Sequence, residues 1–243
     1  MATRPVYEVI KQGSSFVKTH NVDFQWFPGF AVIQKQKSIE SLHSCFESLT
    51  GTGTVLEISS KSKNELGVLL SAFNLGMTTK KSKRKVSVES AFQGSKKFVH
   101  GGPYQDLYYE TSRKAKKDSR LKDSGELVGF QFFGEDWPTE PKTLFYDWIY
   151  LNALYRNKDL NEKILNFSAF TDIEFNPDKS INCQAYSAAL YVSLANRGIL
   201  EKTLQSRSNY LELLGLKNKH DKKGTDIPKS KQLSLPGFDE FES

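Results

Sequence analysis

The sequence predicts an α+β fold that is largely helical, with a small β-sheet and a small N-terminal βα lobe. Two kinds of periodicity indicate this class. Apolar residues alternate with polar ones over residues 22–26 and 128–132, as in half-buried strands. They recur instead at helical spacing over residues 39–49, 144–155 and 184–195. A chain of 243 residues, 38% of them hydrophobic, can bury one sizeable core.

Residues 1–60 are expected to form the βα lobe. A Pro-Gly pair separates two apolar runs within residues 22–34, which is typical of a β-hairpin. Ser38 is placed to cap the helix that follows, and paired glycines end that helix before a strand over residues 55–59. The lobe therefore combines a hairpin, one helix and one further strand.

Residues 61–216 are expected to form the main domain. Ser87 is placed to N-cap a helix that reaches about Phe98, and Thr139 to begin a strongly apolar helix. The helix over residues 184–195 is rich in alanine and serine, which let another element approach closely, so it should lie centrally in the core. Shorter elements are expected as helices at 112–120, 160–165 and 204–214 and as an extended segment at 170–176.

Residues 217–243 are predicted to be a flexible tail, because they are polar and charged with few apolar residues before position 232. Within the tail, the segment from Gln232 to Phe238 reads Gln-Leu-Ser-Leu-Pro-Gly-Phe. This segment resembles the peptide by which proteins bind the bacterial sliding clamp, and disordered tails often bind partners through such short motifs. The sliding clamp is therefore a predicted partner.

The charge of the chain favours an anionic partner. The net charge is +6 and the pI is near 9.1. Two dense basic clusters stand out, with five basic residues of eight over residues 78–85 and six of ten over residues 113–122. Two interpretations stay open for each cluster: contact with nucleic acid, or a solvated surface.

No metal, cofactor or membrane is expected. Cys45 and Cys183 lie far apart and show no metal-ligand spacing, and the four histidines form no pattern with acidic residues or cysteines. There is no P-loop or dinucleotide fingerprint. The first residues lead into no apolar segment, and polar residues interrupt the most apolar stretch, residues 144–155. We therefore expect a cytoplasmic protein.

Glu89, Gln93 and Lys96 are candidate site residues, because positions i, i+4 and i+7 line one face of a helix. A carboxylate in the first helical turn is favoured by the helix dipole and can act as a base or stabilise a cation. The alternative is a solvent-facing stripe of charged residues.

Two other positions allow both a functional and a structural interpretation. Asp172 and Glu174 alternate, so they would face one side of an extended segment, either in a site or on the polar face of an edge strand. Trp137 lies where a strand turns toward a helix, and it can stack on a base or close the core.

Several short motifs together resemble the NADAR (YbiA-like) superfamily. Leu70-Ser-Ala-Phe73 is similar to its LSNF signature, with Ala72 in place of asparagine, and Val88-Glu-x-x-Phe-Gln-x-x-Lys96 is similar to its VEHxxQxxK signature. Further segments follow in the same order as in the superfamily. They are residues 113–116, similar to its EAK segment, Trp137, similar to its single tryptophan, residues 145–147, similar to its MYE segment, and residues 157–165, similar to its NxELxxxL stretch. The C-terminal pattern of the superfamily has no clear equivalent. With the N-terminal lobe included, the chain is most similar to NADAR antitoxins of DarT-type toxins.

This resemblance implies a YbiA/NADAR-like domain with an N-glycosidase activity that removes ADP-ribose from guanine bases in DNA, expected to be single-stranded. Breaking a C1″–N bond builds positive charge on the ribose, which a nearby carboxylate stabilises. The implied catalytic residues are Glu89, Lys96 and Asp172. The implied residues for binding ADP-ribose or the base are Ser71, Phe73, Asn74, Gln93, Trp137, Asn182 and Gln184. The DarT-type toxin is an implied partner.

Two other functions compete with this one. A YbiA-like N-glycosidase would act on riboflavin-pathway intermediates, but a small metabolite does not require the two basic clusters. An antitoxin without catalysis would neutralise by binding ADP-ribose or the toxin itself.

Overall fold

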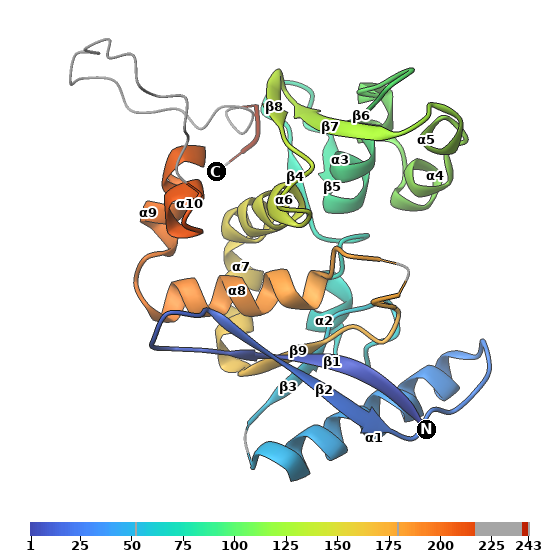
Figure 1. Cartoon of the computed structure of the whole chain (residues 1–243), viewed down its shortest axis with the longest axis vertical. Helices are drawn as coiled ribbons and strands as arrows, with labels where there is room; N and C mark the ends of the chain where they lie inside the picture. Colours follow the sequence, from blue (N-terminus) through green and yellow to red (C-terminus); the bar gives the residue numbers. More distant parts are fainter. Residues whose placement is uncertain (52, 179, 217–239, 243) are drawn as a thin grey trace.

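The computed structural model describes residues 1–51, 53–178, 180–216 and 240–242. These residues form an α+β fold, which confirms the predicted class (Figure 1). They contain a four-stranded sheet at one end of the molecule, a three-stranded sheet at the other, and a two-stranded hairpin beside the latter. Two long helices cross the middle of the molecule between the two larger sheets.

The four-stranded sheet joins three N-terminal strands to one strand from much later in the sequence. Its order is β2-β1-β9-β3, with β1 at Ala2–Val9, β2 at Val17–Phe24, β3 at Val55–Glu57 and β9 at Ala169–Thr171. β1 is antiparallel to β2 and β9, whereas β3 is parallel to β9. Helix α1 (Val32–Thr50) packs on this sheet through Ile39, Leu42 and Phe46. Residues 1–60 therefore share a sheet with a strand from the middle of the main domain.

The hairpin predicted over residues 22–34 is wrong, because strands β1 and β2 form the hairpin and α1 begins at Val32. Ala31, rather than Ser38, is the N-cap residue. Ser38 lies inside the helix, where its hydroxyl bonds to main-chain atoms of α1 and of the preceding loop. The apolar run there does not mark a buried strand, since Phe30 is fully exposed.

The helix that carries Glu89 begins as predicted and ends earlier. Ser87 Oγ accepts a hydrogen bond from Ser90 N (3.0 Å), so Ser87 caps α3 (Val88–Gly94). The helix ends at Gly94, which packs directly against the Tyr108 ring. Residues Lys96–Phe98 form strand β6 and pair with β7 (Leu127–Phe132). The other elements before residue 140 are α2 (Glu65–Leu69), β4 (Gly76–Thr78), β5 (Lys85–Ser87), η1 (Gln105–Tyr109), α4 (Ser112–Lys117), α5 (Arg120–Asp123) and β8 (Glu135–Trp137).

The two central helices are α6 (Leu144–Arg156) and α8 (Gln184–Asn196), and most of their residues are buried. The two helices contact each other, and Ser187 Oγ donates to Asp147 Oδ1 across this contact (2.5 Å). α6 begins at Leu144 rather than Thr139, because Pro141 disfavours helical backbone in the residue before it. The chain also contains α7 (Lys158–Lys163), η2 (Ile164–Asn166), α9 (Leu200–Leu204) and α10 (Arg207–Leu213). No helix in the described ranges has the length and apolar character needed to cross a membrane.

Residues 240–242, which we expected in the flexible tail, are packed against the hairpin of β4 and β5. Glu242 N donates to Thr78 O (2.8 Å), and Lys80 N donates to Glu240 O (2.7 Å). The Phe241 ring is buried and lies in the aromatic cluster of the three-stranded sheet. The predicted clamp-binding segment, residues 232–238, lies outside the described residues.

Candidate active site

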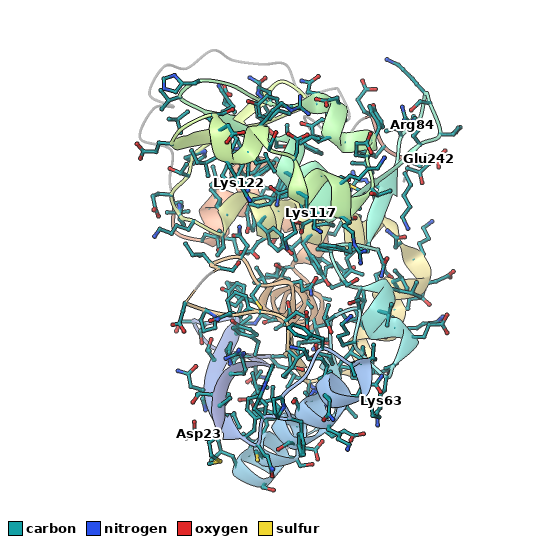
Figure 2. The ribbon with its side chains drawn as sticks, turned by 90° about the vertical axis from the view of Figure 1, so that its right-hand side faces the viewer. Asp23, Lys63, Arg84, Lys117, Lys122 and Glu242 are labelled. Carbon is teal, nitrogen blue, oxygen red and sulfur yellow. The ribbon has the colours of Figure 1, made fainter. Side chains whose placement is uncertain are left out.

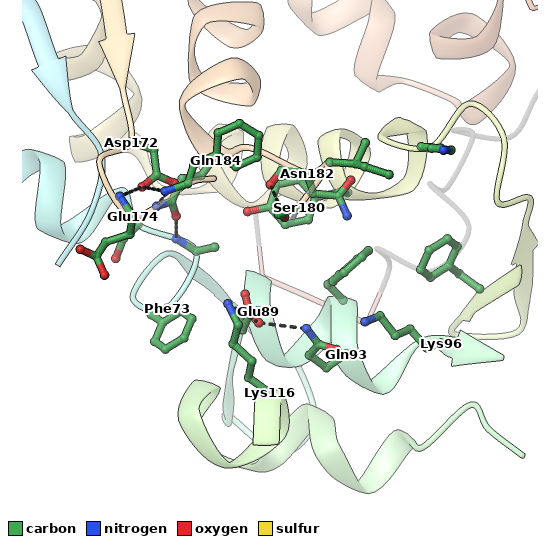
Figure 3. A pocket seen from close by; sticks show the side chains of 18 of the residues that line it. Phe73, Glu89, Gln93, Lys96, Lys116, Asp172, Glu174, Ser180, Asn182 and Gln184 are labelled. Atoms are coloured by element: carbon green, nitrogen blue, oxygen red, sulfur yellow. Dashed lines mark hydrogen bonds and ion pairs between the residues drawn. The ribbon is translucent and has the colours of Figure 1, made fainter. Parts of the chain in front are cut away.

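A pocket lies between α3 and the segment that connects β9 to α8 (Figure 3). Its volume is about 830 Å³, and small-molecule sites typically measure about 300–1,000 Å³. Eight of the ten predicted site residues line it: Ser71, Phe73, Glu89, Gln93, Lys96, Asp172, Asn182 and Gln184. The other two, Asn74 and Trp137, lie elsewhere. Side chains that are separated by about a hundred positions in the sequence thus meet in one cavity.

Glu89 holds its carboxylate on the α3 side of the pocket. Its Oε1 accepts a hydrogen bond from Gln93 Nε2 (2.9 Å) and lies 3.6 Å from Lys116 Nζ. A carboxylate only accepts hydrogen bonds, so the Gln93 amide must present its nitrogen to Glu89. The Gln93 Oε1 atom is then buried without a protein partner among the described residues. This oxygen is an acceptor that a bound ligand can satisfy.

Lys96 lines the same side of the pocket, although it lies on β6 rather than on the helix as its spacing from Glu89 predicted. Its Nζ lies 4.9 Å from the centre of the Phe92 ring. Burial lowers the pKa of Lys96, while the charge of Glu89 acts in the opposite direction and that of Lys116 lowers it further. Lys96 therefore has more nucleophilic and acid character than an exposed lysine.

Asp172 lies on the opposite side of the pocket, at the end of β9 (Figure 3). Its Oδ1 accepts from the main-chain nitrogens of Glu174 (3.0 Å) and Phe175 (3.2 Å), and its Oδ2 accepts from Gln184 Nε2 (2.9 Å). The predicted extended segment is therefore a turn after Thr171, although Asp172 and Glu174 both line the pocket. Glu174 is half-exposed and pairs with Lys35 (3.4 Å).

The Asp172 carboxyl group retains its proton at neutral pH. Burial raises its pKa to about 8, and the negative charge of Glu57 contributes to the same shift. Gln184 holds the group in place: its Oε1 accepts from Ala72 N (2.7 Å), while its Nε2 also donates to Ile58 O (2.6 Å). An acid with a raised pKa thus faces the side of the pocket that carries Glu89.

The polar side chains of the loop before β4 are hydrogen-bonded within the protein. Ser71 Oγ donates to Val68 O (2.7 Å) and accepts from Asn74 Nδ2 (3.1 Å), so these polar groups already have partners. Asn74 also donates to Val68 O (2.8 Å) and does not line the pocket, which corrects its predicted role. Asn182, by contrast, has a buried Oδ1 without a partner among the described residues.

Trp137 is a core residue, and its predicted alternative as a base-stacking residue is wrong for this pocket. It is 2% exposed. Its ring packs against Phe145 and Trp148, with centroid distances of 5.5 and 5.6 Å, and the Arg207 guanidinium covers it at 4.4 Å. The aromatic residue that is open to the pocket is Phe73, which is 39% exposed.

Lys116 is a site residue that sequence reasoning missed. Besides its ion pair with Glu89, its Nζ lies 5.2 Å from the centre of the Phe73 ring. It belongs to the basic cluster of residues 113–122. The sequence does not indicate which of the six basic residues of this cluster reaches the pocket. Tyr146, which is buried on α6, was missed as well, although residues 145–147 were part of the family resemblance.

The described residues form an α+β protein with a pocket lined by carboxyl groups, lysines and amide side chains. Comparison with known protein families matches residues 2–224 to the DarT1-associated NADAR antitoxins. The chain therefore belongs to this antitoxin family, as the sequence motifs indicated. A search among curated proteins found no match.

Proposed function

We propose that this antitoxin is an N-glycosidase that releases ADP-ribose from modified guanine in DNA and so reverses the action of a DarT-type toxin. The observation that carries the proposal is the pair of unlike carboxyl groups in one pocket. Glu89 is a carboxylate with a cationic partner, whereas Asp172 has a pKa of about 8 and carries a proton. Hydrolysis of a glycosidic bond requires one group of each kind.

The reaction can be written with these two groups. The C1″–N bond breaks as the Asp172 proton moves to the departing guanine nitrogen, which keeps the bonding electron pair. The Glu89 carboxylate stabilises the positive charge that builds on the ribose. Glu89 then accepts a proton from the water whose oxygen bonds to C1″. Proton exchange with solvent restores both carboxyl groups.

Gln93 and Asn182 fit the binding of such a substrate. Each has a buried carbonyl oxygen without a partner among the described residues. Guanine N–H groups and ribose hydroxyls are hydrogen-bond donors, so they can satisfy these acceptors. Phe73 offers a partly exposed ring on which a base can stack.

Three roles fit Lys96: donor of a proton to the base, ligand of the diphosphate, or nucleophile toward the opened ribose aldehyde. The lowered pKa of Lys96 favours the first and the third, since both benefit from an amine that gives up its proton more readily than an exposed lysine. Reduction with borohydride during turnover distinguishes them. Only a Schiff base, formed by the amine with loss of water, would leave ADP-ribose covalently attached to Lys96.

The basic cluster on α4 and α5 is the better candidate for contact with the DNA backbone. Lys116 of this cluster reaches the pocket, and Arg113 and Lys117 are exposed on the same helix. Both clusters are partly neutralised: on the β4–β5 hairpin Lys83 pairs with Glu242 and Lys81 lies 3.8 Å from Glu240. On α4 and α5, Lys114 pairs with Glu110 and Arg120 with Asp106, so access to the pocket is what distinguishes this cluster. Figure 2 shows Arg84 and Glu242 close together, whereas Lys117 and Lys122 lie apart from them.

The decisive experiment measures release of ADP-ribose from a guanine-modified oligonucleotide by the wild type and by Glu89→Gln. We expect the substitution to reduce kcat by roughly 10²–10³-fold, because it removes the charge that stabilises the transition state. Glu174→Gln is the matched control, since Glu174 also lines the pocket but is half-exposed. Equal loss in both variants, or full activity in Glu89→Gln, would remove Glu89 from the mechanism.

The same assay separates the competing functions. Activity on an oligonucleotide should fall steeply with ionic strength, because bound phosphates release counterions. A YbiA-like enzyme for small metabolites would show little salt dependence and would prefer a free nucleotide. If the wild type binds ADP-ribosylated DNA or the toxin but never releases ADP-ribose, the antitoxin acts by binding.

A further inference from the structure

Glu57 is a buried carboxyl group that the proposed reaction does not use directly. It ends β3, is 2% exposed and does not line the pocket. Its Oε2 accepts from Thr171 Oγ1 (2.6 Å), and its Oε1 accepts from Ile173 N (2.9 Å). The two donors flank Asp172 in the sequence. Glu57 therefore holds, through these two hydrogen bonds, the segment that places Asp172 at the pocket. Burying an acidic side chain among neutral donors lowers the stability of the folded protein.

The hydrogen bonds around Thr171 identify the direction of donation. The Thr171 hydroxyl has one hydrogen, which it donates to Glu57 Oε2 (2.6 Å). His43 Nε2 lies 2.8 Å from the same hydroxyl and must therefore donate to it. Burial lowers the pKa of His43 to about 4, so this histidine is neutral near pH 7. The series of hydrogen bonds therefore runs from His43 through Thr171 to Glu57, which accepts the last of them.

We propose that Glu57 is a positioning residue for Asp172. Of these two neighbouring acids, Glu57, which lies outside the pocket, carries the negative charge, so Asp172, which lines the pocket, keeps its proton. This inference rests on the proposed function, in which Asp172 is the acid. It also assigns a role to the N-terminal lobe, because β3 supplies Glu57 and α1 supplies His43.

The electrostatics support this division between the two acids. Two neighbouring buried acids rarely ionise together, since the first charge opposes the second. Burial raises the pKa of Glu57, but hydrogen bonds from Ser59, Thr171 and Ile173 act in the opposite direction. The charge of Glu57 then raises the pKa of Asp172. The other groups that face Asp172 are Tyr7 of β1, Tyr146 and Tyr150 of α6, Cys183 and Gln184 at the start of α8, and Glu174.

Those tyrosines and the cysteine are neutral in the working range. Burial raises the pKa of Tyr7, Tyr146, Tyr150 and Cys183 above their ordinary values. Gln184 has no charge, and Glu174 is half-exposed and paired with Lys35. Burial is therefore the largest cause of the raised pKa of Asp172, and Glu57 is the charged group that adds to it.

The test is the pH profile of kcat/KM for release of ADP-ribose from a modified guanine oligonucleotide. In the wild type, activity should fall as pH rises through about 8, where Asp172 loses its proton. In Glu57→Gln this alkaline limb should move to lower pH by about one unit, because the charge that retains the proton is gone. His43→Gln is the matched control: it alters the same hydrogen-bonded chain without removing a carboxylate, and its limb should stay in place.

The outcomes separate this inference from the proposed function. An active wild type with an unmoved limb in a folded Glu57→Gln would overturn the role of Glu57. A wild type that never releases ADP-ribose would instead overturn the proposed function. In that case, a carbon NMR titration of the Asp172 carboxyl group, with and without Glu57→Gln, still tests the coupling without substrate. If Glu57→Gln does not fold, Thr171→Val removes one donor from Glu57 and should move the limb in the same direction.

Discussion

The two sides of the pocket place the same chemical group in opposite states. On the α3 side, Glu89 lies beside Lys116 and accepts from Gln93, so its negative charge is compensated. On the β9–α8 side, Asp172 is surrounded by neutral donors and a second acid, and its pKa rises to about 8. In the proposed mechanism, the environment rather than the residue type gives one side a base and the other an acid.

The packing of α4 explains why a cation lies beside Glu89. Ser112 Oγ, at the first residue of α4, donates to Phe73 O (2.8 Å) and lies 2.8 Å from Ser87 Oγ. These contacts fix α4 against the start of α3 and so bring Lys116 to Glu89. Among the described residues Asp172 forms no ion pair: its hydrogen bonds come from the neutral donors Glu174 N, Phe175 N and Gln184 Nε2.

Replacing the acid is expected to have the largest effect. Asp172→Asn keeps the shape of the side chain but has no acidic proton, so kcat should fall by roughly 10²–10⁴-fold. The alkaline limb of the pH profile should disappear as well. Steady-state release of ADP-ribose measures both. An unchanged limb in this variant would show that another group, such as Lys96, is the acid.

The same substitution should change the dependence of stability on pH. An acid whose folded pKa is raised contributes fully below its ordinary pKa of 3.8, and this contribution is lost as pH rises toward about 8. Asp172→Asn should therefore flatten the decline in unfolding free energy over that range. Denaturant unfolding at several pH values measures it, and an equally steep decline would contradict the raised pKa.

Replacing the aromatic residue at the pocket should have the next largest effect, whereas replacing the core tryptophan should leave KM nearly unchanged. Phe73→Ala removes an exposed ring at the pocket, and stacking on a base contributes roughly 1–3 kcal/mol, so KM should rise about 10–100-fold. Trp137→Phe is the matched comparison: Trp137 packs in the core, and KM should stay near the wild-type value. Titration of modified oligonucleotide measures both. A larger effect for Trp137→Phe, in a protein of unchanged stability, would restore the stacking role for tryptophan.

Removing the cation beside Glu89 should have the smallest effect. Lys116 is 57% exposed, so solvent screens its ion pair with Glu89. Exposed pairs contribute about 0–1 kcal/mol. Lys116→Met should therefore lower kcat/KM by only about 2–5-fold at low salt, and the difference should shrink at high salt. A loss comparable to that of Glu89→Gln would indicate direct contact between Lys116 and the substrate.

Much of the pocket was predictable because local signals and family motifs coincide there. Ser87 marks the start of α3, and Glu89 and Gln93 lie one helical turn apart, which the structure confirms with a hydrogen bond. Lys96 was predicted for the wrong reason, since a glycine packed on Tyr108 ends the helix before it. Its place in the pocket comes from strand pairing with β7.

The remaining features depend on contacts that no local pattern contains. The bond between Thr171 and Glu57 spans 114 positions, so neither residue carries a sign of the other. Trp137 looked equally suited to the core and to a base because burial depends on neighbours from α6 and on Arg207. Phe241 was assigned to the tail because its flanking residues are polar.

By itself, the sequence determined the α+β class, the family resemblance and the candidates Glu89 and Gln93, since these depend on periodicity and on short motifs. Only the tertiary structure decided which acid keeps its proton and which aromatic ring is open to the pocket. The physical reason is that charge state and burial depend on every group packed around a side chain. For Asp172 those groups come from β1, β3, α6 and α8.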